Sequence, residues 1–264
     1  IYKLLLKPIL NSGDQKKLII IPDGLLNYLP FAALNTDPRG ISYLAENHAI
    51  SYVNSATLLS ELRQRQPKEQ TILAFAPNFD GTVSVSSPDR GKLLPLPNNK
   101  KEVEQILTSF QGRAYVDGEA SLRNFRSQLS SFGMVHLATH AIFDDTAPEY
   151  SYLAFAQNGN AVEDLLYVAD LYNLQLDADL VTLSACESGI GDLKRGEGFL
   201  SLARGFFYSG AASIASTLWK INDASTTKLM AGFYKNLSKG ESKDMALQNA
   251  QIEFLHSNQD NGLS

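Results

Sequence analysis

The sequence predicts an α/β protein built on a mainly parallel sheet with helices on both faces. From residue 71 onward, short apolar runs typical of buried strands alternate with segments of helical periodicity. The runs are continuous rather than alternating apolar and polar, as in strands covered on both sides. The chain has 264 residues, of which 44% are hydrophobic and 19% charged, so it can bury a core of one large or two small domains.

Apolar runs that end at turn residues mark the expected strands. They lie at residues 17–22, 71–76, 114–116, 134–139, 152–156, 180–185 and 212–219, and two more short strands are expected within 42–53. Residues 25–34 are apolar but contain Pro30, which favours a packed loop or a short helix.

Helices are expected between these strands. Ser55 and Ser121 are suitable N-caps, and the helix after Ser55 should run to about Gln66. A helix over residues 100–110 places Val103, Ile106, Leu107 and Phe110 on one face. Further helices are expected at 198–208 and from about Asp223 and Glu241. Residues 78–97 are rich in Gly, Ser, Asp and Pro and predict a long exposed loop, a kind of segment that is often functional.

Two parts of the chain are expected. Residues 1–67 form an N-terminal segment packed on a core of residues 68–264, as one continuous unit. Because the first residue is Ile1 rather than Met, we expect the sequence to be a fragment of a longer protein.

Charge and cysteine content exclude several functions. The 23 basic and 28 acidic residues give a net charge of −5 without a basic run, so no nucleic-acid partner is expected. No apolar stretch approaches the ~20 residues of a membrane span, so no membrane association is expected. The single cysteine excludes an intrachain disulfide and a cysteine-based zinc site, and favours a reducing compartment, the cytoplasm. No cofactor and no metal are expected.

Two reactive side chains follow apolar strands. His140 comes at the carboxyl end of the run MVHLAT, and Cys186 comes directly after LVTLSA. A glycine-rich loop containing Gly189, Gly191 and Gly196 follows the cysteine and can approach a ligand closely. Since ligand sites of parallel sheets form at the carboxyl ends of strands, both residues are candidates for one site.

A cysteine and a histidine together suit nucleophilic catalysis. An imidazole can accept the thiol proton and later deliver it to a leaving amine. The backbone amides of Ala141 and Cys186 are candidates for stabilising an oxyanion.

The motifs around these residues resemble the CHAT family, caspase-like cysteine peptidase domains of bacteria that often follow tetratricopeptide repeats. HLATHA is similar to the family's histidine motif, and LSACESGIG with RGEGFLSLARGFFYSGAASIASTLWKIND to its cysteine motif. LIIIPDGLLNYLPFAAL resembles the family's N-terminal segment. His140 and Cys186 lie 46 residues apart (186 − 140), close to the roughly 50 residues of caspases.

The resemblance implies a caspase-like fold and a cysteine endopeptidase with a Cys–His dyad. Cys186 would be the nucleophile and His140 the general acid and base. It also implies regulated proteolysis of a dedicated protein partner, controlled by an upstream repeat region or an activating partner.

The chain departs from the family pattern in two places. Ala141 stands where the family usually has glycine, which matters only if that position needs a positive φ. The family's last strand does not follow the final helix, so one sheet edge is expected to stay open.

Several residues are candidates for substrate binding. Related peptidases select a basic residue before the cut with acids placed like these, and Trp219 resembles a residue that walls the substrate cleft. The candidate acids are Asp144, Asp145, Glu187 and Asp192. For any single acid, an ordinary role as a solvated loop residue or a helix cap is the preferred interpretation, and Trp219 is equally suited to be a core residue.

The remaining histidines are assigned structural roles. His136 precedes His140 by four residues, which on a strand is roughly 13 Å and too far to share a metal. We therefore expect His136 to be buried and hydrogen-bonded, and His48 and His256 to lie outside the site. The glycine-rich loop lacks the Lys-Ser/Thr of a phosphate-binding loop.

Two other functions remain open from the sequence. One is a catalytically silent caspase-like scaffold that binds partners, and the other is a thiol hydrolase or transferase acting on small molecules.

Overall fold

The computed structural model describes residues 1–10, 16–80, 93–156, 164–184, 186–187, 197–217 and 223–259. The chain forms two compact units. Ile1–Arg65 and Leu229–Ser264 make up one, called here the terminal unit, and Gln66–Lys228 makes up the other, called the core unit. The division into residues 1–67 and 68–264 that the sequence suggests stays a prediction.

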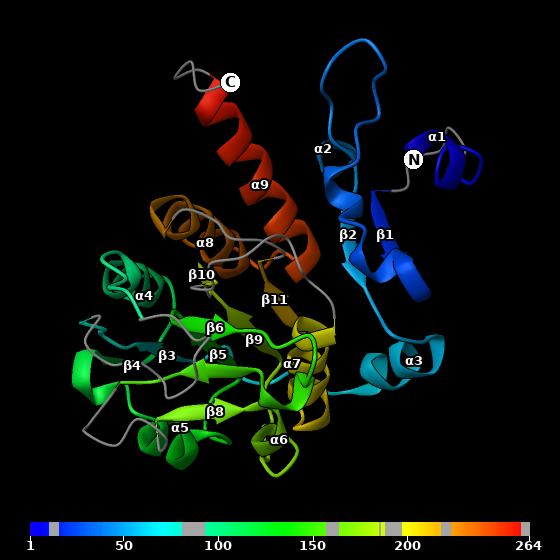
Figure 1. Ribbon diagram of the computed structural model, residues 1–264. Coiled ribbons are helices and arrows are strands. Elements are labelled where there is room, and N and C mark those ends of the chain that lie inside the picture. Colours follow the sequence, from blue (N-terminus) through cyan, green and yellow to red (C-terminus); the bar gives the residue numbers. More distant parts are fainter. Residues whose placement is uncertain are drawn as a thin grey trace. The chain divides into compact units, whose positions relative to one another are not determined.

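Five parallel strands form the central sheet of the core unit (Figure 1). In spatial order they are β11 (Ile214–Ser216), β9 (Leu180–Leu183), β5 (Met134–Leu137), β3 (Ile72–Ala76) and β4 (Gly112–Val116). Strands β9, β5 and β3 are buried at every residue, which requires cover on both faces. The predicted α/β class with a mainly parallel sheet is therefore confirmed.

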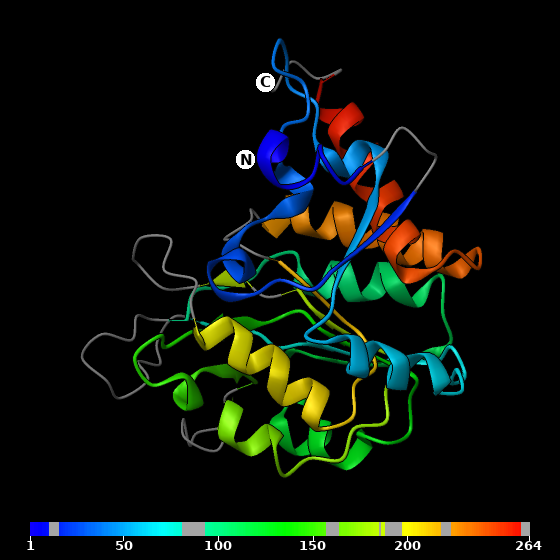
Figure 2. The same ribbon diagram turned by 90° about the vertical axis from the view of Figure 1, so that its right-hand side faces the viewer.

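Alternate residues of β3 point to the two helical layers. Leu73 and Phe75 share a core cluster with Phe125 of α5 (Leu122–Gln128), and α6 (Val168–Leu171) and α7 (Glu197–Tyr208) contribute to the same cluster. Ala74 packs instead with Val103 of α4 (Asn99–Leu107) on the other face. Figure 2 shows α5, α6 and α7 below the sheet and α4 above it.

A smaller sheet of four strands continues from the central one. In spatial order it contains β10 (Cys186–Glu187), β6 (His140–Ile142), β7 (Tyr152–Ala154) and β8 (Leu165–Tyr167). Strand β6 pairs in parallel with β10 and antiparallel with β7. The chain enters this sheet directly from β5 and from β9, with two residues between the strands in each case. His140 therefore begins a new strand instead of ending β5.

Both predicted helix N-caps are confirmed. The Ser55 side chain accepts the Leu58 N–H at the start of α3 (Ala56–Gln64), and Ser121 accepts the Asn124 N–H at the start of α5. The two closing helices are α8 (Asp223–Ser238) and α9 (Lys243–Gln259). Single turns of 3-10 helix form η3 (Asp117–Glu119) and η4 (Pro148–Tyr150).

Short elements differ from the expectation. Residues 42–53 hold one helical turn, α2 (Leu44–Asn47), and one strand, β2 (Ala49–Tyr52), in place of two strands. The Glu46 side chain accepts the Tyr43 N–H at 2.5 Å and so caps α2. Strand β8 and helix α6 were not predicted, because elements of three and four residues are too short to display a period.

Two residues of the loop predicted at residues 78–97 are buried instead of exposed. Phe79 is 5% and Leu93 is 2% exposed. Both pack against Tyr152 and Leu165 of the small sheet. The expectation of an exposed loop is therefore wrong for these two residues. Asn78, Asp80, Leu94, Pro95 and Pro97 are exposed, and residues 81–92 lie outside the described residues.

The terminal unit is built around a two-stranded parallel sheet. Strand β1 (Lys17–Ile20) pairs with β2, and among the described residues it pairs with no other strand. Leu18 and Ile20 pack on Phe31 and Leu44. The unit also contains α1 (Tyr2–Leu5), η1 (Gly24–Tyr28) and η2 (Phe31–Ala33), the last two within the predicted packed segment. None of the described helices is long and apolar enough to span a bilayer.

Phe75 is the centre of an aromatic cluster beneath the sheet, so its truncation tests the packing. Its ring lies 5.1 Å from that of Tyr115, 5.6 Å from Phe125 and 5.7 Å from Phe155. Phe75→Ala should lower the free energy of unfolding by about 3–5 kcal/mol. Urea unfolding measures this as a lower midpoint with an unchanged slope. Tyr208, 71% exposed, is the control, and Tyr208→Ala should change the midpoint little.

Candidate active site

His140 and Cys186 are register partners on neighbouring parallel strands (Figure 1). In the central sheet, Leu137 of β5 lies opposite Leu183 of β9. Three residues further along the chain from each of these, in β6 and β10, His140 lies opposite Cys186. Both pairs are 46 residues apart in sequence (183 − 137 and 186 − 140). The small sheet thus continues the register of the central sheet without a slip.

This register brings the backbones of the two candidate residues together. Adjacent strands of a sheet lie about 4.8 Å apart, and register partners project their Cβ atoms to the same side. Of Cys186 the structure describes the backbone alone. Cys186 and His140, which the sequence placed separately at two strand ends, are therefore neighbours.

The imidazole of His140 is held on two sides. Its Nε2 atom lies 2.7 Å from the main-chain oxygen of Leu94. Its ring centroid lies 4.7 Å from that of Phe79, and the residue is only 3% exposed. Because a carbonyl oxygen can only accept, Nε2 must carry the hydrogen of this bond. Nδ1 is then the nitrogen that gains or loses a proton while the bond persists.

The contact from Leu94 was missed by the sequence analysis. A main-chain carbonyl has no residue-type signature, so any amino acid at this position supplies it. The only available signal was the length of the loop, which marks it as functional without identifying the acceptor.

Ala141 fits its position without backbone strain. It lies in β6 opposite Leu153 on one side and Glu187 on the other, and it is 1% exposed. Among the described non-glycine residues only Asp117 has a positive φ, so Ala141 does not occupy the left-handed region. Replacement of the family's glycine by alanine at this position therefore needs no unusual φ.

Two of the candidate acids accept hydrogen bonds from backbone N–H groups. Oδ1 of Asp144 accepts the N–H groups of Thr146 and Ala147 at 3.0 and 2.9 Å, which closes a turn. Oδ1 of Asp145 accepts the N–H of Gly198 at 3.2 Å, at the start of α7. Both carboxylates thus have the ordinary structural roles that the sequence also allowed.

The start of α7 approaches the same turn closely. A Cβ atom on Gly198 would lie 2.9 Å from the Ser151 hydroxyl and 3.1 Å from the Asp144 nitrogen, so a side chain does not fit there. Asp192, Trp219 and the glycine-rich loop before Gly198 lie outside the described residues, as does the side chain of Glu187.

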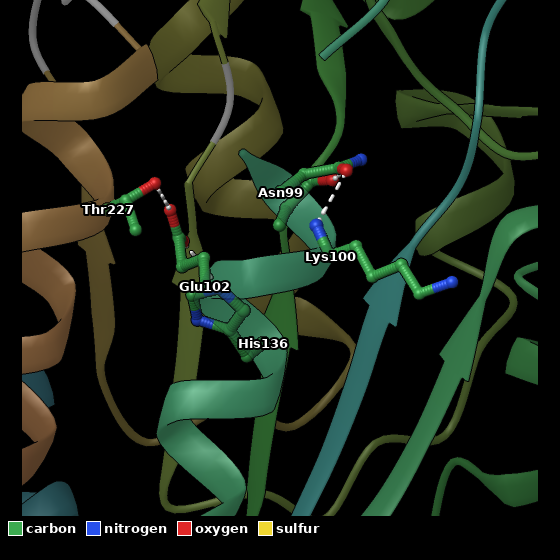
Figure 3. A network of polar contacts seen from close by, with 6 residues as sticks. Asn99, Lys100, Glu102, His136 and Thr227 are labelled. Atoms are coloured by element: carbon green, nitrogen blue, oxygen red, sulfur yellow. Dashed lines mark hydrogen bonds and ion pairs between the residues drawn. The ribbon is translucent and has the colours of Figure 1, made fainter. Parts of the chain in front are cut away.

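His136 is buried and hydrogen-bonded, as predicted. Its Nε2 atom lies 2.8 Å from Oε1 of Glu102, and the side chains are 0% and 2% exposed. Oε2 of Glu102 accepts a 3.3 Å hydrogen bond from the Thr227 hydroxyl. Figure 3 shows Glu102 between the other two side chains. Among the described residues no group of three or more His, Cys, Asp or Glu residues is arranged to hold a metal ion.

Known proteins resemble this chain in sequence and in fold. A model of the CHAT domain family matches residues 1–262. Human tetratricopeptide repeat protein 28 is 25% identical over 276 residues, which cover 90% of this chain and 11% of that protein. The mouse protein of the same name is 24% identical over 266 residues, covering 86% and 11%. The chain therefore spans about a tenth of the length of these relatives.

The fold is also that of a known peptidase. The crystal structure of the Arg-specific cysteine proteinase gingipain R superposes with a TM-score of 0.50 at 9% identity. The match covers 81% of this chain and 51% of the proteinase. The mixed α/β fold is thus of the caspase-like cysteine proteinase type.

The bond to Leu94 predicts one tautomer of His140. Wherever the ring is neutral, imidazole ¹⁵N spectra should show the Nε2–H form, because the Leu94 carbonyl requires a donor at that atom. His140→Ala assigns the signal by its disappearance. A neutral imidazole protonated at Nδ1 would contradict the contact.

Proposed function

The chain belongs to the CHAT domain family, and from this premise we propose that it is a cysteine endopeptidase with Cys186 as nucleophile and His140 as general acid and base. The observation that carries the proposal is the register of β6 and β10, which makes these two residues strand neighbours. A nucleophile and its general base must lie within hydrogen-bond reach of each other, and a cysteine beside a histidine is such a pair.

The hydrogen bond between His140 and Leu94 supports the proposed role. With Nε2 donating to Leu94, Nδ1 accepts the thiol proton of Cys186 and creates an ion pair. The thiolate attacks the carbonyl carbon of the scissile peptide bond, and the carbonyl π electrons move to oxygen. The amides of Ala141 and Cys186 are the proposed donors to that oxyanion.

Collapse of the tetrahedral intermediate completes the first half of the reaction. The C–N bond breaks while Nδ1–H of His140 protonates the leaving amine, and an acyl thioester remains on Cys186. Water, deprotonated by Nδ1, then attacks the thioester, and the thiol is regenerated as the carboxylic acid product leaves. The Leu94 carbonyl keeps the ring oriented through both halves and interacts favourably with the imidazolium.

The substrate is proposed to be a specific protein partner. The relatives are named as tetratricopeptide repeat proteins, and by analogy an upstream repeat region or an activating partner regulates cleavage. Selection of a basic residue before the cut is assigned to the candidate acids of the sequence, Asp144, Asp145, Glu187 and Asp192, and a wall of the cleft to Trp219. The single cysteine fits a cytoplasmic protein.

The lone thiol allows a direct test of the dyad. The alkylation rate of Cys186 against pH, followed by intact mass, should give an apparent thiol pKa below ~8.5 in the wild type. In His140→Ala it should rise toward that reference value, since the imidazolium that stabilises the thiolate is gone. Equal, ordinary pKa values in both proteins would contradict an activated pair.

Cleavage itself is tested with a peptide library presented to the longer natural protein. Cys186→Ala and His140→Ala should each lower turnover by at least ~10²-fold. Full function of Cys186→Ala in partner binding, without any peptide cleavage by the wild type, would instead establish a silent scaffold. Turnover of small esters without regard to peptide length would favour a small-molecule hydrolase.

A further inference from the structure

Helix α4 presents two polar side chains to the core. Asn99 and Glu102, three residues apart on the helix, are 6% and 2% exposed. Glu102 binds His136 and Thr227, as described above. Figure 3 shows Asn99 at the start of the same helix, with its oxygen accepting the Lys100 N–H. Neither the proposed mechanism nor the sequence motifs use Asn99.

The amide nitrogen of Asn99 joins two strand ends. Nδ2 donates to the main-chain oxygen of Pro77 at 2.7 Å and to that of Ala138 at 3.2 Å. Pro77 follows the last residue of β3, and Ala138 follows the last residue of β5. A primary amide carries two hydrogens on one nitrogen, so a single side chain satisfies both buried carbonyl groups.

These contacts surround the segments that hold His140. Pro77 lies two residues before Phe79, whose ring contacts the imidazole. Ala138 lies two residues before His140 itself. The Leu94 carbonyl, which accepts the Nε2 hydrogen, belongs to the segment from Leu93 to Asn98 that leads directly into Asn99.

From this arrangement we propose that Asn99 is a positioning residue for the His140 imidazole. Asn99 fixes three parts of the chain relative to one another: the strand that carries His140, the segment of Phe79 and the segment of Leu94. Asn99 touches neither the imidazole nor the thiol in this scheme and acts through those three segments. Its effect on catalysis rests on the proposed function, whereas its effect on the orientation of His140 does not.

Aspartate is the informative substitution, because it keeps the shape of asparagine and removes the donor. In Asn99→Asp a carboxylate oxygen would face two carbonyl oxygens, which repels both strand ends. The His140–Leu94 bond should weaken, and the imidazole ¹⁵N spectrum should lose its single Nε2–H form. Cys186 alkylation at pH 7 should slow by about 10- to 100-fold, with the apparent thiol pKa shifted upward.

Val103→Ala is the matched control. Val103 lies on the same helix, is fully buried and packs on Ala74 and Ala138, so its truncation loosens α4 without removing a hydrogen bond. This variant should unfold at lower urea concentration while the His140 spectrum and the alkylation profile stay as in the wild type. If Asn99→Asp fails to fold, Asn99→Ser, which keeps one donor hydrogen, should give a smaller shift in the same direction.

The outcomes separate this proposal from the previous one. A wild-type imidazole spectrum and pH profile in both folded Asn99 variants would overturn the positioning role and leave Asn99 with a structural one. An ordinary thiol in the wild type that His140→Ala does not change would overturn the dyad. In that case the imidazole spectrum alone still decides whether Asn99 orients His140.

Discussion

The parallel register of β5 and β9 is the constraint on which the candidate site depends. Strands β6 and β10 follow these two strands after two residues each and keep the same offset, so His140 meets Cys186 as Leu137 meets Leu183. A shift of the pairing register by one residue would turn every side chain of the strand to the other face of the sheet, so each face would pack against the side chains that now belong to the other. The apolar packing of the central sheet thus determines which residues face each other at its carboxyl end.

Features that depend on the type and spacing of side chains were predicted well from the sequence. Continuous apolar runs gave the central strands, and Ser55 and Ser121 gave two helix starts, because burial and capping each demand particular residue types. His140 and Cys186 were predicted as a pair because both follow apolar strands and because their motifs resemble those of the CHAT family. Their register was not predictable, since it results from pairing between segments that are distant in sequence.

Features formed by main-chain atoms or by single turns escaped prediction. The acceptor of His140 is the carbonyl group of Leu94, and the acceptors of Asn99 are those of Pro77 and Ala138. Any residue type offers a carbonyl group, so tertiary structure alone selects these three. Acidic residues show the opposite difficulty: Asp144 and Asp145 are candidates for a substrate pocket in sequence, and in the structure each also accepts a hydrogen bond from the backbone.

A carbonyl group orients an imidazole differently from a carboxylate. The bond from Nε2 to Leu94 is charge-assisted only when the imidazole is protonated, because the carbonyl acceptor is neutral. A carboxylate would attract the imidazolium with a full negative charge, so a carbonyl stabilises the thiolate–imidazolium pair less, and the placement of the ring matters more. That placement depends on the loop between β3 and α4. Its residues Phe79 and Leu93 pack on the small sheet, and Asn99 follows it at the start of α4. Leu94 itself is 61% exposed, so the acceptor of His140 belongs to a residue whose side chain faces solvent.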